Sequence, residues 1–380
     1  MSDPFERILG QPKVREFLRA TVASGLIGQS YLFTGPAGSN KTTAAYALAQ
    51  AVVCEDSGCG TCDACKRVMR RRHPDVIHLE PAGVDGYLAE QVRDIVADVN
   101  MAPVQAKSKV YIIDRADQMG ASAANAFLKT LEEPPAHVVL ILLARTRAGV
   151  LSTIVSRCQV VPFRQIPERI AAGIVAQNSG VAADRARWAL AACNGSIDAA
   201  IEFARSTDRF LFRQRVFKVM EDLAAADDLD ILGYAAELIE MAKAPLDLVR
   251  RGLDEDLEAS REFMARSAIR QIEARNKRAL SKKTKDVLYE TTALMRSWLR
   301  DMLVVCGGAA NLEVNGDAAA AIRAAAAKTD EGRVVRALAA VDEADTAIRY
   351  NVSPETCIDV LLLQMREELY GSHSARGVAR

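Results

Sequence analysis

Residues 31–51 read YLFTGPAGSNKTTAAYALAQA, and this stretch decides how the N-terminal half of the chain is interpreted. It begins with four apolar or β-favouring residues, continues through a glycine-containing turn and, from Lys41, becomes rich in helix-forming residues. A strand, a glycine loop and a helix in this order predict a phosphate-binding loop of the form G-x-x-x-x-G-K-T. Backbone N–H groups of such a loop, together with the positive end of the helix, surround phosphate oxygens.

The loop itself, GPAGSNKT at residues 35–42, departs from the pattern at one position, where Asn40 replaces the last glycine. Asparagine keeps the backbone N–H and tolerates a positive φ better than most residues, so the sequence leaves open whether nucleotide binding survives. Lys41 is expected to reach the outer phosphates and Thr42 to hold Mg²⁺. The predicted nucleotide-binding residues are Gly35, Gly38, Asn40, Lys41, Thr42, Thr43 and Asp114.

Short apolar runs alternate with helical patterns through the first 165 residues. Five runs are too short for buried helices and are predicted to be strands, at residues 31–34, 75–80, 110–114, 138–143 and 159–163. Helices are predicted between them, for example over 41–53 and 88–101. Strands separated by helices favour an α/β domain with a parallel sheet, whose ligand lies at the carboxyl ends of the strands.

Strand patterns stop after residue 168, and the rest of the chain is helical in pattern. Residues 166–206 are predicted to form a small helical domain and residues 207–380 an all-α domain. The basic run ARNKRALSKKTKD at 274–286 lacks apolar periodicity and is interpreted as a solvated loop rather than a nucleic-acid-binding arm. The last ten residues are expected to fray.

Composition excludes several classes of protein. The 380 residues include 49 basic and 49 acidic side chains, so the chain as a whole is not an electrostatic nucleic-acid binder. Its start lacks the charged and apolar regions of a signal peptide, and no apolar run approaches the roughly 18 residues of a membrane helix. We therefore expect a cytoplasmic protein without a membrane partner. The four scattered histidines predict no catalytic arrangement.

The strand VYIID ends at Asp114, where an active P-loop ATPase places the Asp that helps to hold Mg²⁺. Such an enzyme places next an acidic residue that orients or deprotonates the attacking water. Here that position holds Arg115, whose guanidinium stays protonated and cannot accept a proton. Asp117 is the alternative acid, two residues further on.

Four of the eight cysteines, Cys54, Cys59, Cys62 and Cys65, fall within twelve residues. Four thiolates at such spacing can close tetrahedrally around a structural Zn²⁺, and four protein ligands leave no open position for catalysis. An iron–sulfur cluster is the alternative. The remaining cysteines are isolated among apolar neighbours, which suits a reducing compartment.

Several motifs, in order and spacing, resemble those of bacterial clamp-loader subunits of the AAA+ class. They are FERILGQ near the start, the altered phosphate loop, IIDRADQMGASAANAFLKTLEEPPAHV at 112–138 and TIVSRC at 153–158. The resemblance is specific over the first 165 residues and looser beyond, where residues 351–365 look like the closing helix of the family's collar domain. It implies an AAA+ domain over 1–165 with a zinc module at 54–65, a lid over 166–206 and a collar over 207–380.

Two kinds of subunit share this layout, the ATP-hydrolysing gamma/tau and the usually silent delta-prime. Asn40, Arg115 and Asp198 depart from the active pattern, the last where active members place a sensor arginine, and together they favour the silent kind. An active gamma/tau-type subunit is the alternative, and a zinc-dependent DNA-binding factor is disfavoured because no basic recognition helix is evident.

The resemblance also implies a role for Arg157 of the SRC motif, as an arginine finger that projects into a neighbouring subunit's ATP site. A planar, permanently charged group can stabilise charge on phosphoryl oxygens. The implied partners are gamma/tau and delta subunits, the sliding clamp and primer–template DNA. Zinc is the implied structural cofactor, while ATP with Mg²⁺ stays open. Cys158 is interpreted as a buried small residue rather than a reactive thiol.

Overall fold

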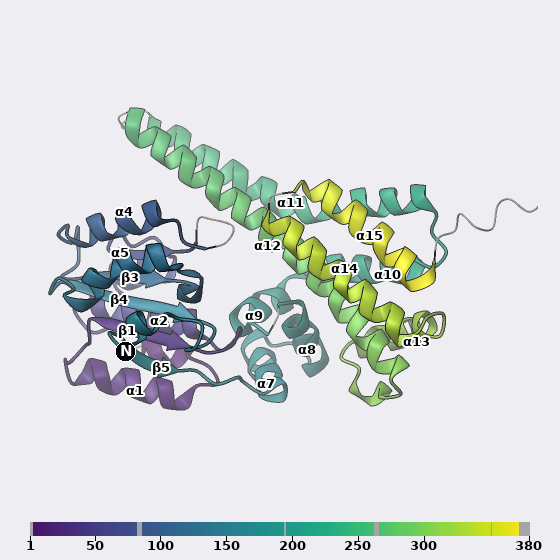
Figure 1. The fold of residues 1–380 in the computed structure, drawn as a ribbon, viewed down its shortest axis with the longest axis horizontal. Coiled ribbons are helices and arrows are strands. Elements are labelled where there is room, and N and C mark those ends of the chain that lie inside the picture. The colour runs from purple at the N-terminus through teal and green to yellow at the C-terminus, as the bar shows by residue number, and fades with distance from the viewer. Residues whose placement is uncertain (1–2, 82–85, 194, 262–265, 351, 372–380) are drawn as a thin grey trace, which may run out of the picture. The chain divides into compact units, whose positions relative to one another are not determined.

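The computed structural model describes residues 3–81, 86–193, 195–261, 266–350 and 352–371 (Figure 1). The tail expected to fray lies almost entirely outside them. Backbone contacts divide the chain into two compact units. Unit 1 is Met1–Ile174 with Gly195–Ile197, and unit 2 is Val175–Asn194 with Asp198–Arg380. Boundaries at residues 165 and 206 stay a prediction.

A five-stranded parallel sheet forms the centre of unit 1, with strand order β2-β3-β4-β1-β5. All five predicted strands are confirmed to within one residue at each end, and with them the α/β class. Their bounds are β1 Ser30–Thr34, β2 Val76–Leu79, β3 Lys109–Ile113, β4 Val138–Ala144 and β5 Gln159–Pro162.

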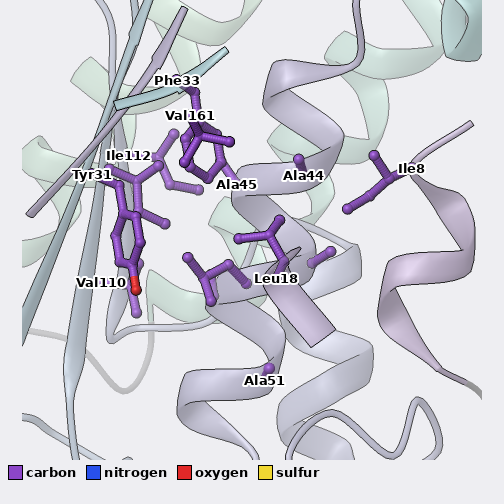
Figure 2. Close-up of a cluster of buried hydrophobic side chains, with 14 of the residues drawn as sticks. Ile8, Leu18, Tyr31, Phe33, Ala44, Ala45, Ala51, Val110, Ile112 and Val161 are labelled. Carbon is purple, nitrogen blue, oxygen red and sulfur yellow. The ribbon is translucent and has the colours of Figure 1, made fainter. Parts of the chain in front are cut away.

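Alternate residues of the strands point to opposite faces, and helices cover both. Tyr31 and Phe33 of β1 join a buried cluster with α1 (Pro12–Ala23) and α2 (Lys41–Val53), shown in Figure 2. Leu32 belongs to the second cluster, with α4 (Ala89–Val99) and α5 (Ala121–Glu132). Apolar side chains on both faces explain the nearly continuous hydrophobic runs of the strands.

Shorter helices complete unit 1: η1 Pro4–Arg7, α3 Asp63–Met69, η2 Ala116–Gln118 and α6 Ser152–Val155. α7 (Glu168–Ser179) follows the last strand. Because β1, β3 and β4 run parallel and are neighbours, the segments that follow them begin at one edge of the sheet. Those segments are the glycine loop, Asp114 and Arg145.

Unit 2 is helical. Its elements are α8 Ala183–Ala192, α9 Ile197–Arg205, α10 Thr207–Asp222, α11 Asp228–Arg261, α12 Arg266–Cys306, η3 Ala310–Leu312, η4 Gly316–Ala318, α13 Ala319–Ala326, α14 Glu331–Arg349 and α15 Pro354–Tyr370. The core includes Trp298 of α12, 1% exposed, which packs edge-on against Phe217 at 5.2 Å. Arg213 is equally buried and is paired with Asp317 at 2.7 Å.

The predicted loop at 274–286 is wrong, because these residues lie inside α12. The run has no glycine or proline, and Arg, Lys, Ala and Leu all favour helix. α11 and α12 pack against each other as two long consecutive helices (Figure 1). Helix propensity therefore prevailed at 274–286 although apolar periodicity is absent. Among the described residues, no helix is long and apolar enough to cross a membrane.

Asp75, just before β2, links this strand to the segment that precedes β3. Its carboxylate is fully buried and accepts backbone N–H bonds from Val104 at 2.6 Å and from Gln105 and Ala106 at 2.8 Å. Burial acts to raise the pKa of Asp75, but these hydrogen bonds outweigh it and hold the pKa below the usual value.

We predict that Asp75→Asn lowers local stability by about 1–3 kcal/mol, because the bonds to a charged acceptor are lost. Both tryptophans, Trp188 and Trp298, lie in unit 2, so hydrogen exchange of peptides from β2 and β3 is the suitable measurement. A carboxylate whose pKa is lowered on folding stabilises above its unfolded pKa and ceases to do so as pH falls, so the difference should shrink below about pH 4. Exposed Asp94→Asn is the control, and equal protection in all three proteins would contradict the prediction.

Candidate functional site

The glycine loop joins β1 to α2, and two of its glycines are required by their surroundings. A Cβ on Gly35 would lie 2.6 Å from the carbonyl oxygen of Phe163. Gly38 has a φ of +73°, and a Cβ there would lie 2.3 Å from the carbonyl oxygen of Gly195. Both distances are shorter than packed atoms permit, so no other residue fits without a backbone shift. The loop conformation therefore depends on Gly35 and Gly38.

Asn40 is the N-terminal capping residue of α2 and takes the left-handed conformation, with φ 65° and ψ 26°. Its side chain makes no capping hydrogen bond; Nδ2 instead donates to the carbonyl oxygen of Leu9 at 2.8 Å. The residue is 8% exposed. The asparagine thus preserves the backbone geometry of a glycine, as its tolerance of positive φ predicts, while its amide is directed to the N-terminal segment.

Lys41 does not extend from the loop. Its ammonium group donates to the carbonyl oxygens of Gly35 at 2.6 Å and Pro36 at 2.7 Å, and to Ser39 Oγ at 3.3 Å. Burial lowers the pKa of Lys41, while the nearby charge of Asp114 raises it. To reach a phosphate group, Lys41 must exchange its bonds to the loop carbonyls. Thr42 and Thr43 occupy the first turn of α2, and both are partly exposed.

Asp114 follows β3 as predicted, and its Oδ1 accepts the backbone N–H of Arg115 at 2.8 Å. Arg115 is exposed and takes a left-handed φ of 48°. Asp117 lies in the next short helix, where Oδ1 accepts the backbone N–H of Arg145 at 3.4 Å. The position after Asp114 therefore presents a cation, and the carboxylate of Asp117 is directed to the segment that follows β4.

Sequence reasoning missed a second set of side chains at this edge of the sheet. His78 of β2, Glu80 and Asp114 place one ligand atom each within 4.8 Å of one another, with His78 Nε2 3.9 Å from Asp114 Oδ2. His78 also packs edge-on against Tyr46 of α2, at 5.7 Å. The register of β2 and β3, which pairs His78 with Ile112, brings the three together. No spacing within one segment could have indicated this group.

Arg157 lies between α6 and β5, with 31% of its side chain exposed. Nε donates to Glu132 Oε1 at 2.8 Å, Nη2 contacts the same oxygen, and Nη1 donates to the carbonyl oxygen of Thr153 at 2.7 Å. The neighbouring thiol of Cys158 is half-buried, and burial raises its pKa to about 12. Cys158 is thus a poor nucleophile at neutral pH, as expected for a packing residue.

The four clustered cysteines come together. Sulfur–sulfur distances are 3.7 Å for Cys54 to Cys59 and to Cys62, and 4.0 Å for Cys59 to Cys65, with all four within 4.8 Å. Four sulfurs at a zinc–sulfur bond length of about 2.3 Å on a tetrahedron would be about 3.8 Å apart. The cluster therefore has the dimensions of a tetrahedral Zn²⁺ site, in which all four positions are filled by thiolates.

Amide donors around the sulfurs favour the thiolate form that a metal requires. Cys65 Sγ accepts from the Gly60 N–H at 3.3 Å, and Cys59 Sγ accepts from the Cys62 N–H at 3.4 Å. Hydrogen bonds from Thr61 lower the pKa of Cys59 to about 6, whereas burial raises that of Cys65 to about 12. A bound Zn²⁺ would offset the burial of the second thiolate.

The chain is similar to subunits of bacterial DNA polymerase III. Residues 10–167 match the family model described as DNA polymerase III, delta subunit. The delta' subunit of DNA polymerase III from Bacillus subtilis is 33% identical over 217 residues, which are 56% of this chain and 65% of that protein. The chain thus resembles subunits of DNA polymerase III, through a family model that covers less than half of its length and a delta' subunit that is matched over 65% of its own.

A tau subunit of DNA polymerase III matches a shorter region. The tau subunit from Bacillus subtilis is 38% identical over 173 residues, 44% of this chain and 30% of that protein. This chain thus spans less than two thirds of the length of either relative. Among solved structures, a gamma-subunit-related protein from Thermotoga maritima aligns over 94% of this chain and 99% of its own, at 16% identity and a TM-score of 0.45. A likeness at that level carries no functional conclusion.

The structure also shows how the N-terminal segment contacts the glycine loop in this chain. Gln11 is 5% exposed, and its Nε2 donates to the carbonyl oxygens of Ser39 at 3.2 Å and Arg164 at 2.6 Å. With the bond from Asn40 to Leu9, the segment FERILGQ supports the glycine loop from outside. From sequence alone this segment carried a resemblance but no mechanism, because its partners lie up to 153 residues away.

We predict that the purified chain carries one Zn²⁺, which metal analysis should show at a ratio of one per chain. Cys62→Ser should lose the metal, because oxygen from serine is a poor zinc ligand. Cys158→Ser, which alters a thiol outside the cluster, is the control and should keep it. Substitution by Co²⁺ should give the absorption of a tetrahedral four-sulfur site, whereas iron with sulfide in the purified chain would favour the cluster alternative.

Proposed function

We propose that the chain is a delta-prime-type clamp-loader subunit, which helps to place the sliding clamp on primer–template DNA without hydrolysing ATP appreciably itself. The similarity to a delta' subunit supports this over more of the chain than the similarity to tau. In the proposal, gamma/tau and delta subunits are its partners and the helical residues 207–380 make the assembly contacts. The same assignment implies a cytoplasmic protein.

The observation that carries the proposal is Arg115 beside Asp114. Hydrolysis requires a group that can orient or accept a proton from water near the γ-phosphate. The guanidinium of Arg115 cannot accept a proton, and the side chain is exposed. Two more features differ from an active site. Lys41 donates to carbonyl oxygens of its own loop, and Asn40 replaces the glycine of the motif.

Asp198 is a further departure from the active pattern. It stands in the first turn of α9, where a negative charge favours the helix. At the position where active relatives carry a sensor arginine, it offers no positive charge to a phosphate. This departure supports a silent subunit independently of the two at the loop and at β3.

The proposed contribution to hydrolysis is made in trans. Arg157 is partly exposed and permanently charged, so its planar fork suits phosphoryl oxygens of a nucleotide held by a neighbouring subunit. Such fingers are worth roughly 10³–10⁵ in rate in other phosphoryl-transfer systems. The chain would then be needed for hydrolysis that it does not perform.

An active gamma/tau-type ATPase is the second candidate, and a specific observation favours it. Lys41, Thr42 and Asp114 are all retained, and the charge of Asp117 reaches Lys41. If Asp117 turned from the Arg145 N–H towards a nucleotide, it would supply the missing carboxylate. Nucleotide binding with Mg²⁺, without turnover, is compatible with the first candidate.

We predict that the purified chain has ATP turnover far below the roughly 1–1000 per second of ordinary enzymes. The residual rate should be unchanged in Lys41→Ala, since no catalysis at this loop is expected. Steady-state phosphate release measures both. Turnover near 1 per second that disappears in Lys41→Ala, and in Asp117→Asn, would establish the active candidate instead.

In a loader reconstituted with its own gamma/tau and delta subunits, we predict that Arg157→Ala lowers ATP turnover about tenfold or more. Arg157→Lys should be almost as impaired, because a point charge cannot replace the planar fork. Arg169→Ala, which removes an exposed arginine from α7, is the control for charge alone. Unchanged turnover in Arg157→Ala would refute the finger.

A further inference from the structure

The guanidinium of Arg157 is already occupied within its own chain. Nε and Nη2 converge on Glu132 Oε1, and Nη1 donates to the Thr153 carbonyl oxygen at 2.7 Å and to Ser156 Oγ at 3.2 Å. These contacts use four of the five N–H donors of a guanidinium group, and the carboxylate offsets its charge. In this arrangement Arg157 has little left with which to stabilise a phosphoryl group.

The backbone around Glu132 is held by hydrogen bonds. It is the last residue of α5. The next residue, Glu133, caps the helix, because its N–H donates to the Lys129 carbonyl oxygen at 3.1 Å. The two prolines that follow accept hydrogen bonds from Gln29 Nε2 at 3.2 and 3.0 Å, which tie this turn to the segment before β1. A carboxylate at the negative end of a helix is unfavourable by itself, so Glu132 gains from a cation such as Arg157.

We propose that Glu132 is a positioning residue. It binds the guanidinium of Arg157 within the chain, and this ion pair breaks when Arg157 binds a nucleotide polyphosphate in a neighbouring subunit. This inference rests on the proposed trans finger. The pair is half-exposed, with 31% and 47% of the two side chains accessible, so solvent weakens it. A polyphosphate carries more negative charge than one carboxylate and presents several acceptors to the same fork. The donors on Glu132 Oε1 are therefore exchangeable.

This exchange has a kinetic consequence that a merely structural ion pair lacks. If only the released fraction of Arg157 assists the neighbour, apparent affinity for ATP is reduced by that fraction. Neutralising Glu132 should therefore lower KM and leave kcat nearly unchanged, because the finger is released at saturating ATP in both proteins. Loss of a productive contact would instead lower kcat.

Glu133 offers a matched control. It is the next residue, equally acidic and exposed, and among the described residues Arg157 is paired with Glu132 and not with Glu133. In the reconstituted loader, Glu132→Gln should lower KM for ATP about threefold or more with kcat within about twofold, while Glu133→Gln behaves as the parent chain. In an Arg157→Ala background, Glu132→Gln should have no further effect.

A second measurement needs no partner subunits. The rate at which phenylglyoxal modifies Arg157, followed by mass spectrometry of its peptide in the isolated chain, should rise about threefold in Glu132→Gln and stay constant in Glu133→Gln. Circular dichroism of the variants checks that they fold. An unchanged KM in Glu132→Gln overturns the proposal even if modification rises, and so does a fall in kcat like that of Arg157→Ala. If Arg157→Ala leaves turnover unchanged while modification of Arg157 rises in Glu132→Gln, the trans finger is refuted. The Arg157–Glu132 ion pair within the chain would still be supported.

Discussion

Parallel pairing of β1 with β4 and of β4 with β3 is the constraint on which the rest of unit 1 depends. The register pairs Thr34 with Ala144 and Ile113 with Leu142, so these strands end at one edge of the sheet. The glycine loop, Asp114 and Arg145 follow those ends. Sites assembled this way need a single set of backbone hydrogen bonds, which the buried strands supply. Local departures such as Asn40 can therefore alter the chemistry without altering the scaffold.

Much of this fold could be predicted from sequence because its patterns are short-range. Apolar runs of five or so residues set the strands, and the helix after Lys41 followed from its composition. The contacts that define the site could not be predicted. Leu9 beside Asn40, Glu132 beside Arg157 and His78 beside Asp114 each join segments that only the tertiary fold brings together. The helix at 274–286 shows the converse limit, since propensity prevailed where periodicity was absent.

Two arginines illustrate how context decides the use of one chemical group. Arg115 follows Asp114 just beyond the end of β3, and its permanently protonated guanidinium cannot accept a proton. Arg157, paired with Glu132, has the same charge at a partly exposed position, where in the proposed function it would contact a phosphate bound by a neighbouring subunit. Under the proposed function, Arg115 would leave this chain without hydrolysis and Arg157 would assist hydrolysis in a neighbouring subunit. Each finding alone would be compatible with an ordinary structural role.

The helix α2 connects the two candidate sites of unit 1. It runs from Lys41 to Val53, with Asn40 of the glycine loop as its N-terminal capping residue and Cys54, the first of the clustered cysteines, as its C-terminal capping residue. Its thirteen residues span about 20 Å, and most of its alanines are buried against the sheet. A metal that fixes Cys54 would therefore restrain one end of a rigid element whose other end shapes the loop. If the predicted zinc binds here, its effect would be to support the loop's conformation rather than to add a separate function.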